Sequence, residues 1–242
     1  MLASLVHLVV AALLAALCVK VVQAWRRDRR TYSLLVTVVI AGLVYDNLVL
    51  GAGRWVGEGA LLEALSWPRF VVHALATPLL VIVGFGAARS FGLRWAARRD
   101  LHAAACSVAV VLLLWGLVTE VVGLDLRPEW AGGVLSYGAA TSATPVPAIA
   151  TILVLLAFGA MLWRTCGWPW LALGAAVMFA ASGLGGVSPL LTNVGELALA
   201  AALVATEREA GRREHSWSVA ARSPSRVEVA RSRAPRARHT GA

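Results

Sequence analysis

The chain has 242 residues, of which 59% are hydrophobic and only 14% are charged, whereas soluble domains are about half apolar and about a quarter charged. This balance excludes an ordinary soluble globular domain and favours an integral membrane protein. The net charge of +9 does not indicate nucleic-acid binding, because the charges lie between apolar segments and in the last 36 residues.

Seven segments approach the length of about 20 apolar residues that a membrane-spanning helix needs. The first is expected to be a helix rather than a signal peptide, because it lacks a basic start and its apolar run is too long. We therefore predict an all-α fold, a polytopic bundle of seven transmembrane helices in residues 1–206 of a multi-pass cell-membrane protein. In chain order the predicted helices are Leu2–Ala24, Ser33–Leu50, Phe70–Ala88, Leu101–Val122, Pro147–Trp163, Trp168–Leu184 and Leu190–Thr206.

The basic residues predict the orientation, because cytoplasmic loops of membrane proteins are enriched in Lys and Arg. In the seven-helix arrangement 19 of the 22 basic residues fall on one side, and only Arg54, Arg69 and Arg127 fall on the other. The N-terminus is therefore predicted outside and the C-terminus in the cytoplasm. Residues 207–242 are rich in Arg, Ser and Pro, so we expect a disordered basic tail that lies against anionic lipid of the bilayer.

A layer of polar side chains is predicted in the outer half of the membrane, where ionisable groups mark functional sites by default. At 1.5 Å per residue, five such residues on four helices fall at similar depth, and the inner half offers nothing comparable. The pattern favours a pocket over a buried network that only holds the helices together. Interhelical polar pairs contribute about 0.6 to 2 kcal/mol, which is less than the cost of burying the carboxylates of Asp46 and Glu196 without partners. The five residues are Asp46, His73, Glu120, Asn193 and Glu196.

The catalytic candidates in this layer are Asp46, Glu196 and His73. Arg69 shares a helix face with His73 and is expected to pair with Asp46 or Glu196, to hold a phosphate or to extend to water. We expect a short interfacial helix in the loop 51–69, and we expect the loop 123–145 to fold over the same mouth. The candidates for substrate binding are Tyr45, Asn47, Glu63, Arg69, Trp115, Glu120 and Asn193.

Several seven-helix families are excluded by the residues they require. A microbial rhodopsin needs a lysine in its last helix, whereas the only lysine here is Lys20. Membrane hydrolases with zinc need several histidines within the helices, whereas only His73 lies deep in one. No metal and no cofactor is therefore predicted.

What remains is an acidic pocket walled by helices, with aromatic residues at its mouth. This arrangement resembles the small seven-helix integral membrane terpene cyclases, whose proposed acids lie on an early helix or its loop and on the last helix. Asp46, Glu58 or Glu63, and Glu196 occupy comparable places. The Asn-x-x-Trp-Glu pattern associated with that family is absent from this sequence.

The resemblance implies an enzyme that acts on an isoprenoid or lipid. A carboxylic acid kept protonated by burial would protonate an epoxide or alkene, and a second carboxylate would collect the final proton. Trp55, Trp67 or Trp115 would stabilise cationic intermediates. Two alternatives remain open: a proton-coupled transporter for a small solute, and a membrane protein that binds lipid or supports assembly without catalysis.

Overall fold

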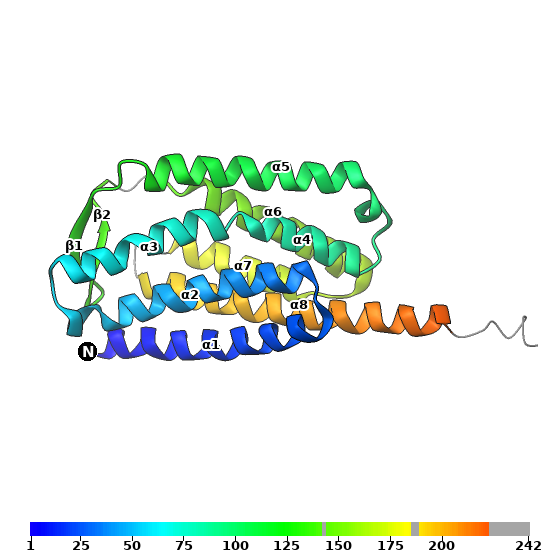
Figure 1. Cartoon of the computed structure of the whole chain (residues 1–242), viewed down its shortest axis with the longest axis horizontal. Coiled ribbons are helices and arrows are strands. Elements are labelled where there is room, and N and C mark those ends of the chain that lie inside the picture. The colour runs from blue at the N-terminus through cyan, green and yellow to red at the C-terminus, as the bar shows by residue number, and fades with distance from the viewer. Residues whose placement is uncertain (142–143, 185–188, 223–242) are drawn as a thin grey trace, which may run out of the picture.

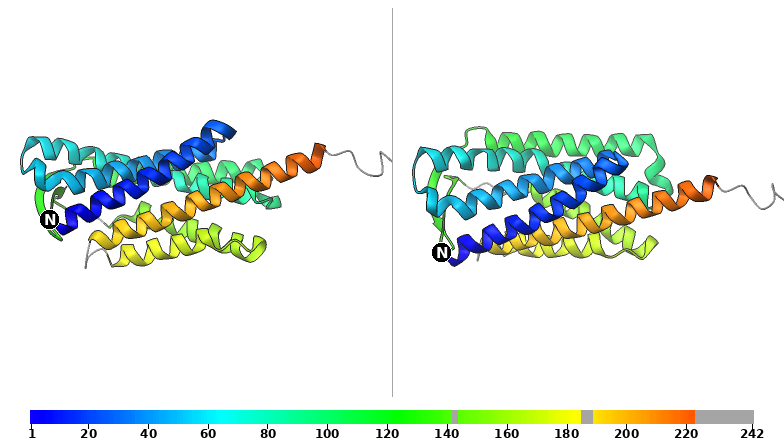
Figure 2. Two further views of the ribbon diagram at one scale, coloured as in Figure 1. Left: turned by 90° about the horizontal axis from the view of Figure 1, so that it is seen from below. Right: turned by 60° about the horizontal axis from the view of Figure 1, so that its bottom comes forward.

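The computed structural model describes residues 1–141, 144–184 and 189–222, with the backbone alone for residues 189 and 218–222. The long helices lie side by side along one axis, and a β-hairpin covers the end of the bundle at which the N-terminus lies (Figure 1). At the opposite end, α8 projects beyond the other helices (Figure 2). We call these the hairpin end and the arginine-rich end. At the latter, α1 ends and the chain turns into α2; Arg26 and Arg27 lie in the last turn of α1, and Arg29 and Arg30 lie between the two helices.

The described residues form eight α-helices, two short helical turns and one β-hairpin. They are α1 (Leu2–Asp28), α2 (Thr31–Val56), α3 (Ala60–Ala76), α4 (Leu79–Ser90), the 3₁₀ turn η1 (Arg94–Ala97), α5 (Arg99–Gly116), the π-helical turn η2 (Leu117–Val121), β1 (Leu126–Ala131), β2 (Val134–Ala139), α6 (Val146–Cys166), α7 (Trp170–Gly183) and α8 (Pro189–Arg222).

Six helical stretches of the described chain are long and apolar enough to cross a membrane, with α3 and α4 counted as one stretch, Ala60–Ser90. The membrane-type helical architecture is therefore confirmed. The predicted helix Trp168–Leu184 corresponds to α7, which has only 14 residues, fewer than the about 20 that a perpendicular span needs.

The break between α3 and α4 occurs at Thr77 and Pro78. Proline has no N–H to donate and its ring clashes with the preceding turn, so it interrupts a helix. The chain continues through a tight turn in which the Leu80 and Val81 amides donate to the Thr77 and Pro78 carbonyls. The predicted single helix Phe70–Ala88 is therefore two helices joined end to end.

The glycine-rich segment after Leu50 belongs to α2, which extends to Val56; its prediction as a loop is wrong. A side chain at Gly51 would meet Leu8 of α1 at 2.6 Å, and one at Gly53 would collide with the Leu135 carbonyl of β2. Small residues at such positions let backbones approach closely. The glycines are therefore sites of close packing rather than of chain reversal, and α3 begins after a turn of only three residues, 57–59.

The predicted end of the last helix at Thr206 is also wrong. Residues 207–222 continue α8 as one helix, and Glu207 itself is fully buried. The remaining part of the predicted tail, residues 223–242, lies outside the described residues.

An apolar core fills the middle of the bundle between its two ends. It joins side chains from α1, α2, α6 and α8 among others, with Leu14, Ile40, Leu155 and Leu203 almost completely buried. This core separates the polar groups of the hairpin end from those of the arginine-rich end, because its buried members are apolar.

Candidate functional site

A cavity of about 600 Å³ lies at the hairpin end, between α2, α3, η2, α8 and the hairpin. This volume is within the range of about 300 to 1,000 Å³ that small-molecule sites occupy. Six of the predicted polar residues line it: Asp46, Arg69, His73, Glu120, Asn193 and Glu196.

An ion pair crosses the cavity wall from α3 to α2. The Arg69 Nε donates to Asp46 Oδ1 over 2.7 Å, and the two side chains are 14% and 25% exposed. Of the partners expected for Arg69, the structure therefore selects Asp46. Because Asp46 retains partial exposure to the cavity, the pair can still contact a bound molecule.

Glu196 of α8 lines the same cavity and interacts electrostatically with both Asp46 and Arg69. Its Oε2 atom is buried and has no hydrogen-bond partner among the residues that the structure describes. A buried polar atom without a partner is costly. An unsatisfied carboxyl oxygen in a cavity wall is therefore a group that a ligand can satisfy.

His73 and Glu120 form the second pair of titratable groups in the cavity. They interact electrostatically, one from α3 and the other from η2, and both line the cavity. η2 is a π-helical turn at the end of α5, and π-turns inside helices occur frequently at functional sites because they redirect side chains. The turn brings Glu120 toward α3, against which η2 packs.

The hairpin forms the wall of the cavity at this end of the bundle, so the loop 123–145 folds over the cavity as predicted. Glu129 of β1 and Ser136 of β2 are cross-strand neighbours, and both line the cavity. The Gly59 amide donates to the Tyr137 hydroxyl over 3.1 Å, which ties the hairpin to the turn between α2 and α3. The loop 123–145 thus closes this end of the bundle with β-structure, whereas residues 60–69, where a short interfacial helix was predicted, form the first turns of α3.

Four of the predicted binding residues do not line the cavity. The Tyr45 hydroxyl donates to the Leu65 carbonyl over 2.7 Å, and Asn47 is fully buried. Glu63 is exposed, and Trp115 is 46% exposed on α5. These four remain predictions without geometric support, because none of them is among the residues around the cavity.

The buried Asn47 shows what such a residue does instead. Its side-chain oxygen lies 3.1 Å from His7 Nδ1, and its amide donates to the Leu43 carbonyl. His7 is also buried. This contact joins α1 to α2, so Asn47 packs two helices together. The depth of a residue in the membrane, counted from the sequence, cannot distinguish such a packing residue from one that lines a cavity.

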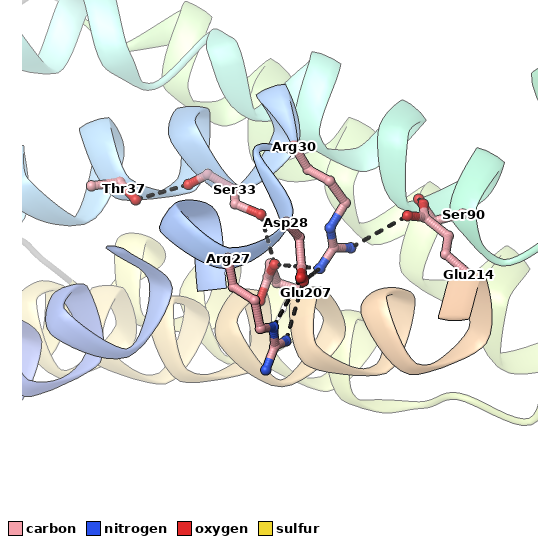
Figure 3. A network of polar contacts seen from close by, with 8 residues as sticks. All are labelled: Arg27, Asp28, Arg30, Ser33, Thr37, Ser90, Glu207 and Glu214. Atoms are coloured by element: carbon pink, nitrogen blue, oxygen red, sulfur yellow. Dashed lines mark hydrogen bonds and ion pairs between the residues drawn. The ribbon is translucent and has the colours of Figure 1, made fainter. Parts of the chain in front are cut away.

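A second polar cluster lies at the arginine-rich end of the bundle. Arg30, the residue before α2, pairs with Glu207 of α8 at 2.8 Å, and Ser33 donates to the same Glu207 oxygen over 2.7 Å (Figure 3). Asp28 and Glu214 lie on either side of the Arg30 guanidinium, at 3.3 and 3.9 Å. The cluster joins the α1–α2 turn to α8.

The donors of the hairpin-end cavity suit proton transfer better than metal binding. Within residues 1–141, 144–184 and 189–222, no group of three or more His, Cys, Asp or Glu side chains is placed to hold a metal ion. Two pairs of titratable groups face one cavity, however, and one guanidinium adds a fixed positive charge. Such sets of carboxyl and imidazole groups serve as general acids and bases.

Comparisons with known proteins add no further identification. The chain matches no protein-family model, and no curated protein and no solved structure shows significant similarity to it. The functional argument therefore depends on the geometry of the cavity.

Proposed function

We propose that the protein is an integral membrane enzyme that performs acid–base chemistry on an isoprenoid or lipid substrate in the hairpin-end cavity. The observation that carries this proposal is the convergence of Asp46, His73, Glu120 and Glu196 on one cavity of about 600 Å³. Scattered structural polar residues have no reason to share a cavity, whereas catalytic groups must.

Each titratable group has a role that follows from its surroundings. Glu196 is the proton donor, because its buried Oε2 lacks a partner in the described chain and a carboxyl group is far less costly to bury as the neutral acid. Asp46, held by Arg69, is the carboxylate that stabilises positive charge or accepts the final proton. His73 with Glu120 forms the second proton-transfer pair.

The rest of the lining defines the substrate class. Apolar side chains surround the polar groups, and a cavity of this mixture accepts an amphiphile with one reactive polar or unsaturated centre. Val39, Leu43, Leu50, Phe70, Val72 and Leu124 contribute apolar surface. The small seven-helix terpene cyclases, which the predicted arrangement of helices and acidic residues resembles, act on such molecules, so we propose a cyclase or another isomerase or lyase of this type.

The proposal includes a membrane topology. The positive-inside rule supports a cytoplasmic arginine-rich end and an outer hairpin end, with α7 as a short seventh span beside the six longer ones. The N-terminus would then be outside, and the cavity would lie in the outer half of the bilayer. Residues 1–206 would form the membrane domain.

The test compares lipid extracts of a host that expresses the full chain and is fed candidate isoprenoids. We expect a product in the wild type that is lost in Glu196→Gln and in Asp46→Asn. Asp100→Asn is the matched control, because Asp100 is an exposed carboxylate at the start of α5 that pairs with Arg98 and does not line the cavity. The proposal fails if both cavity variants form the product at the wild-type level.

A second candidate, a proton-coupled transporter, is favoured by one observation. A separate cavity opens at the arginine-rich end between α1 and α8, as a two-sided path would require. No described residue lines both cavities, and the apolar core lies between them. Solute-driven proton movement in proteoliposomes, abolished by Glu196→Gln, would support transport, whereas product formation without such movement supports the enzyme.

A further inference from the structure

The cavity at the arginine-rich end is itself a candidate binding site, distinct from the proposed catalytic one. It has a volume of about 1090 Å³ and lies between the last turns of α1 and the projecting part of α8. Basic side chains outnumber carboxylates in its walls. The basic ones are Lys20, Arg27, Arg30, Arg208 and Arg212, and the carboxylates are Asp28, Glu207 and Glu214.

Two helix faces supply the polar walls at regular spacing. Lys20, Gln23 and Arg27 follow one another at intervals of three and four residues on α1, and Arg208 and Arg212 are four apart on α8. Residues at these intervals share a helix face. Since α1 and α8 pack against each other, the two basic rows face one cavity.

The carboxylates of this cavity already have partners. Asp28 pairs with Arg27 and Arg30, and Glu207 is held by Arg30 and Ser33 (Figure 3). Glu214 accepts a hydrogen bond from Ser90 and lies near Arg30. Arg27 and Arg30 therefore compensate these three carboxylates to within one negative charge.

The basic residues nearer the mouth are not neutralised in the same way. Lys20 and Arg208 are exposed and form no ion pair with any side chain of the described chain. Arg212 is 69% exposed, and its one ion pair among the described side chains is with Glu209, which does not line the cavity. Positive charge therefore faces the cavity from both helices, and the lining as a whole has two more basic side chains than carboxylates.

Two tryptophans at this end of the bundle support a position of the cavity at the membrane surface. Trp25 on α1 stacks with Arg29, and the indole N–H of Trp168 donates to Thr206 of α8. Tryptophan rings are enriched at the level of the lipid headgroups. The anion available at that level is a phosphate ester, which guanidinium and ammonium groups bind by charge-assisted hydrogen bonds.

We propose that this cavity binds the phosphate group of an anionic phospholipid in the leaflet at the arginine-rich end. Lys20 contributes from α1, and Arg208 and Arg212 contribute from α8. A lipid bound there bridges α1 and α8 and anchors the projecting helix to the membrane surface. This site does not depend on the reaction proposed for the other cavity.

The test titrates phosphatidylglycerol into the detergent-solubilised full chain and counts bound lipids by native mass spectrometry, with phosphatidylcholine as the neutral comparison. The double variant Lys20→Gln/Arg208→Gln removes two charges from the cavity. Arg26→Gln/Arg94→Gln is the matched control, because it removes two exposed charges from the same end outside the cavity lining. Circular dichroism confirms that both variants remain helical.

We expect the wild type to prefer phosphatidylglycerol over phosphatidylcholine. The dissociation constant of its first phosphatidylglycerol molecule should rise about 25-fold in the cavity variant, from about fivefold per basic residue. The control variant should change by less than about threefold. Equal losses in both variants, or no preference for the anionic lipid, would overturn the site. Displacement of the lipid by an equal concentration of inorganic pyrophosphate would overturn the assignment to a lipid and leave a soluble phosphate as ligand.

Discussion

The buried ion pair between Arg30 and Glu207 provides a quantitative prediction about stability. In Glu207→Gln the shape of the side chain is kept, but the carboxylate that accepts from Arg30 at 2.8 Å and from Ser33 at 2.7 Å is lost. The Glu207 side chain is 1% exposed and that of Arg30 is 15% exposed, so solvent cannot replace the lost partner.

The magnitude follows from what Arg30 retains. Removing one partner of a buried ion pair lowers the free energy of unfolding by about 3 to 5 kcal/mol. Arg30 still has Asp28 at 3.3 Å and Glu214 at 3.9 Å, so we expect the lower limit, about 3 kcal/mol. Glu209→Gln, two residues along α8, is the control: its pairs with Arg212 and Arg213 are near the surface, and each contributes about 0.3 to 0.5 kcal/mol.

The assay is SDS titration of the purified chain in mixed micelles, followed by far-ultraviolet circular dichroism. A double variant, Arg30→Met/Glu207→Leu, should lose less stability than Glu207→Gln, because it leaves no unpaired buried charge. If Glu207→Gln loses no more than Glu209→Gln, the cluster in Figure 3 does not hold α8 to the α1–α2 turn, and the reasoning is refuted.

Three further predictions concern packing and the hairpin end. Gly159→Ala should lower the stability of the chain in the same titration by about 1 to 3 kcal/mol, because the new Cβ would clash with the Ala172 backbone across the α6–α7 contact. Gly183→Ala is the control: its Cβ meets nothing within 4 Å, so it should be neutral or stabilising. Equal effects of the two variants would refute the packing argument. Tyr137→Phe removes the acceptor of the Gly59 amide, so amide hydrogen exchange of residues 57–61 should accelerate about fivefold, from a bond of about 1 kcal/mol, and unchanged exchange would contradict it. Arg69→Gln and Asp46→Asn each remove one partner of the same ion pair, so each should destabilise the chain in SDS titration, and the double variant should lose less than the sum of the two single losses. Additive losses would contradict the ion-pair assignment.

The depth of the polar layer could be predicted because a helix rises by a fixed 1.5 Å per residue. Counting along antiparallel helices therefore brought Asp46, His73, Glu120 and Glu196 to one level, and the structure places all four around one cavity. The depth of a residue does not determine in which direction around the helix axis its side chain points. Tyr45 and Asn47, the immediate neighbours of Asp46, consequently point to Leu65 and His7 instead.

The end of α8 was misplaced because a hydropathy window stops at the first charges. Glu207 follows an apolar run and was assigned to the tail, although it is a buried member of the helix. A signal for continuation was present: Glu209 precedes Arg213 by four residues, and such pairs stabilise exposed helix. Burial of Glu207 itself could not be predicted, because its partner Arg30 is 177 residues away in the sequence.

The sequence carries a local signal for the hairpin. Gly132 and Gly133 both have positive φ, 58° and 83°, and they connect β1 to β2. Two successive glycines suit a two-residue hairpin turn, because both central positions of such a turn can require positive φ. The contact of Leu135 with Gly53, by contrast, is a tertiary fact that local sequence does not contain.

The most direct test of the proposed chemistry is performed with purified protein in nanodiscs. Wild type, Glu196→Gln and Asp100→Asn are incubated with an isoprenoid-containing lipid extract, and the extract is compared before and after by liquid chromatography and mass spectrometry. The account predicts that at least one species is converted by the wild type and by Asp100→Asn but not by Glu196→Gln. Conversion by all three proteins at the same rate, or by none of them, would contradict it.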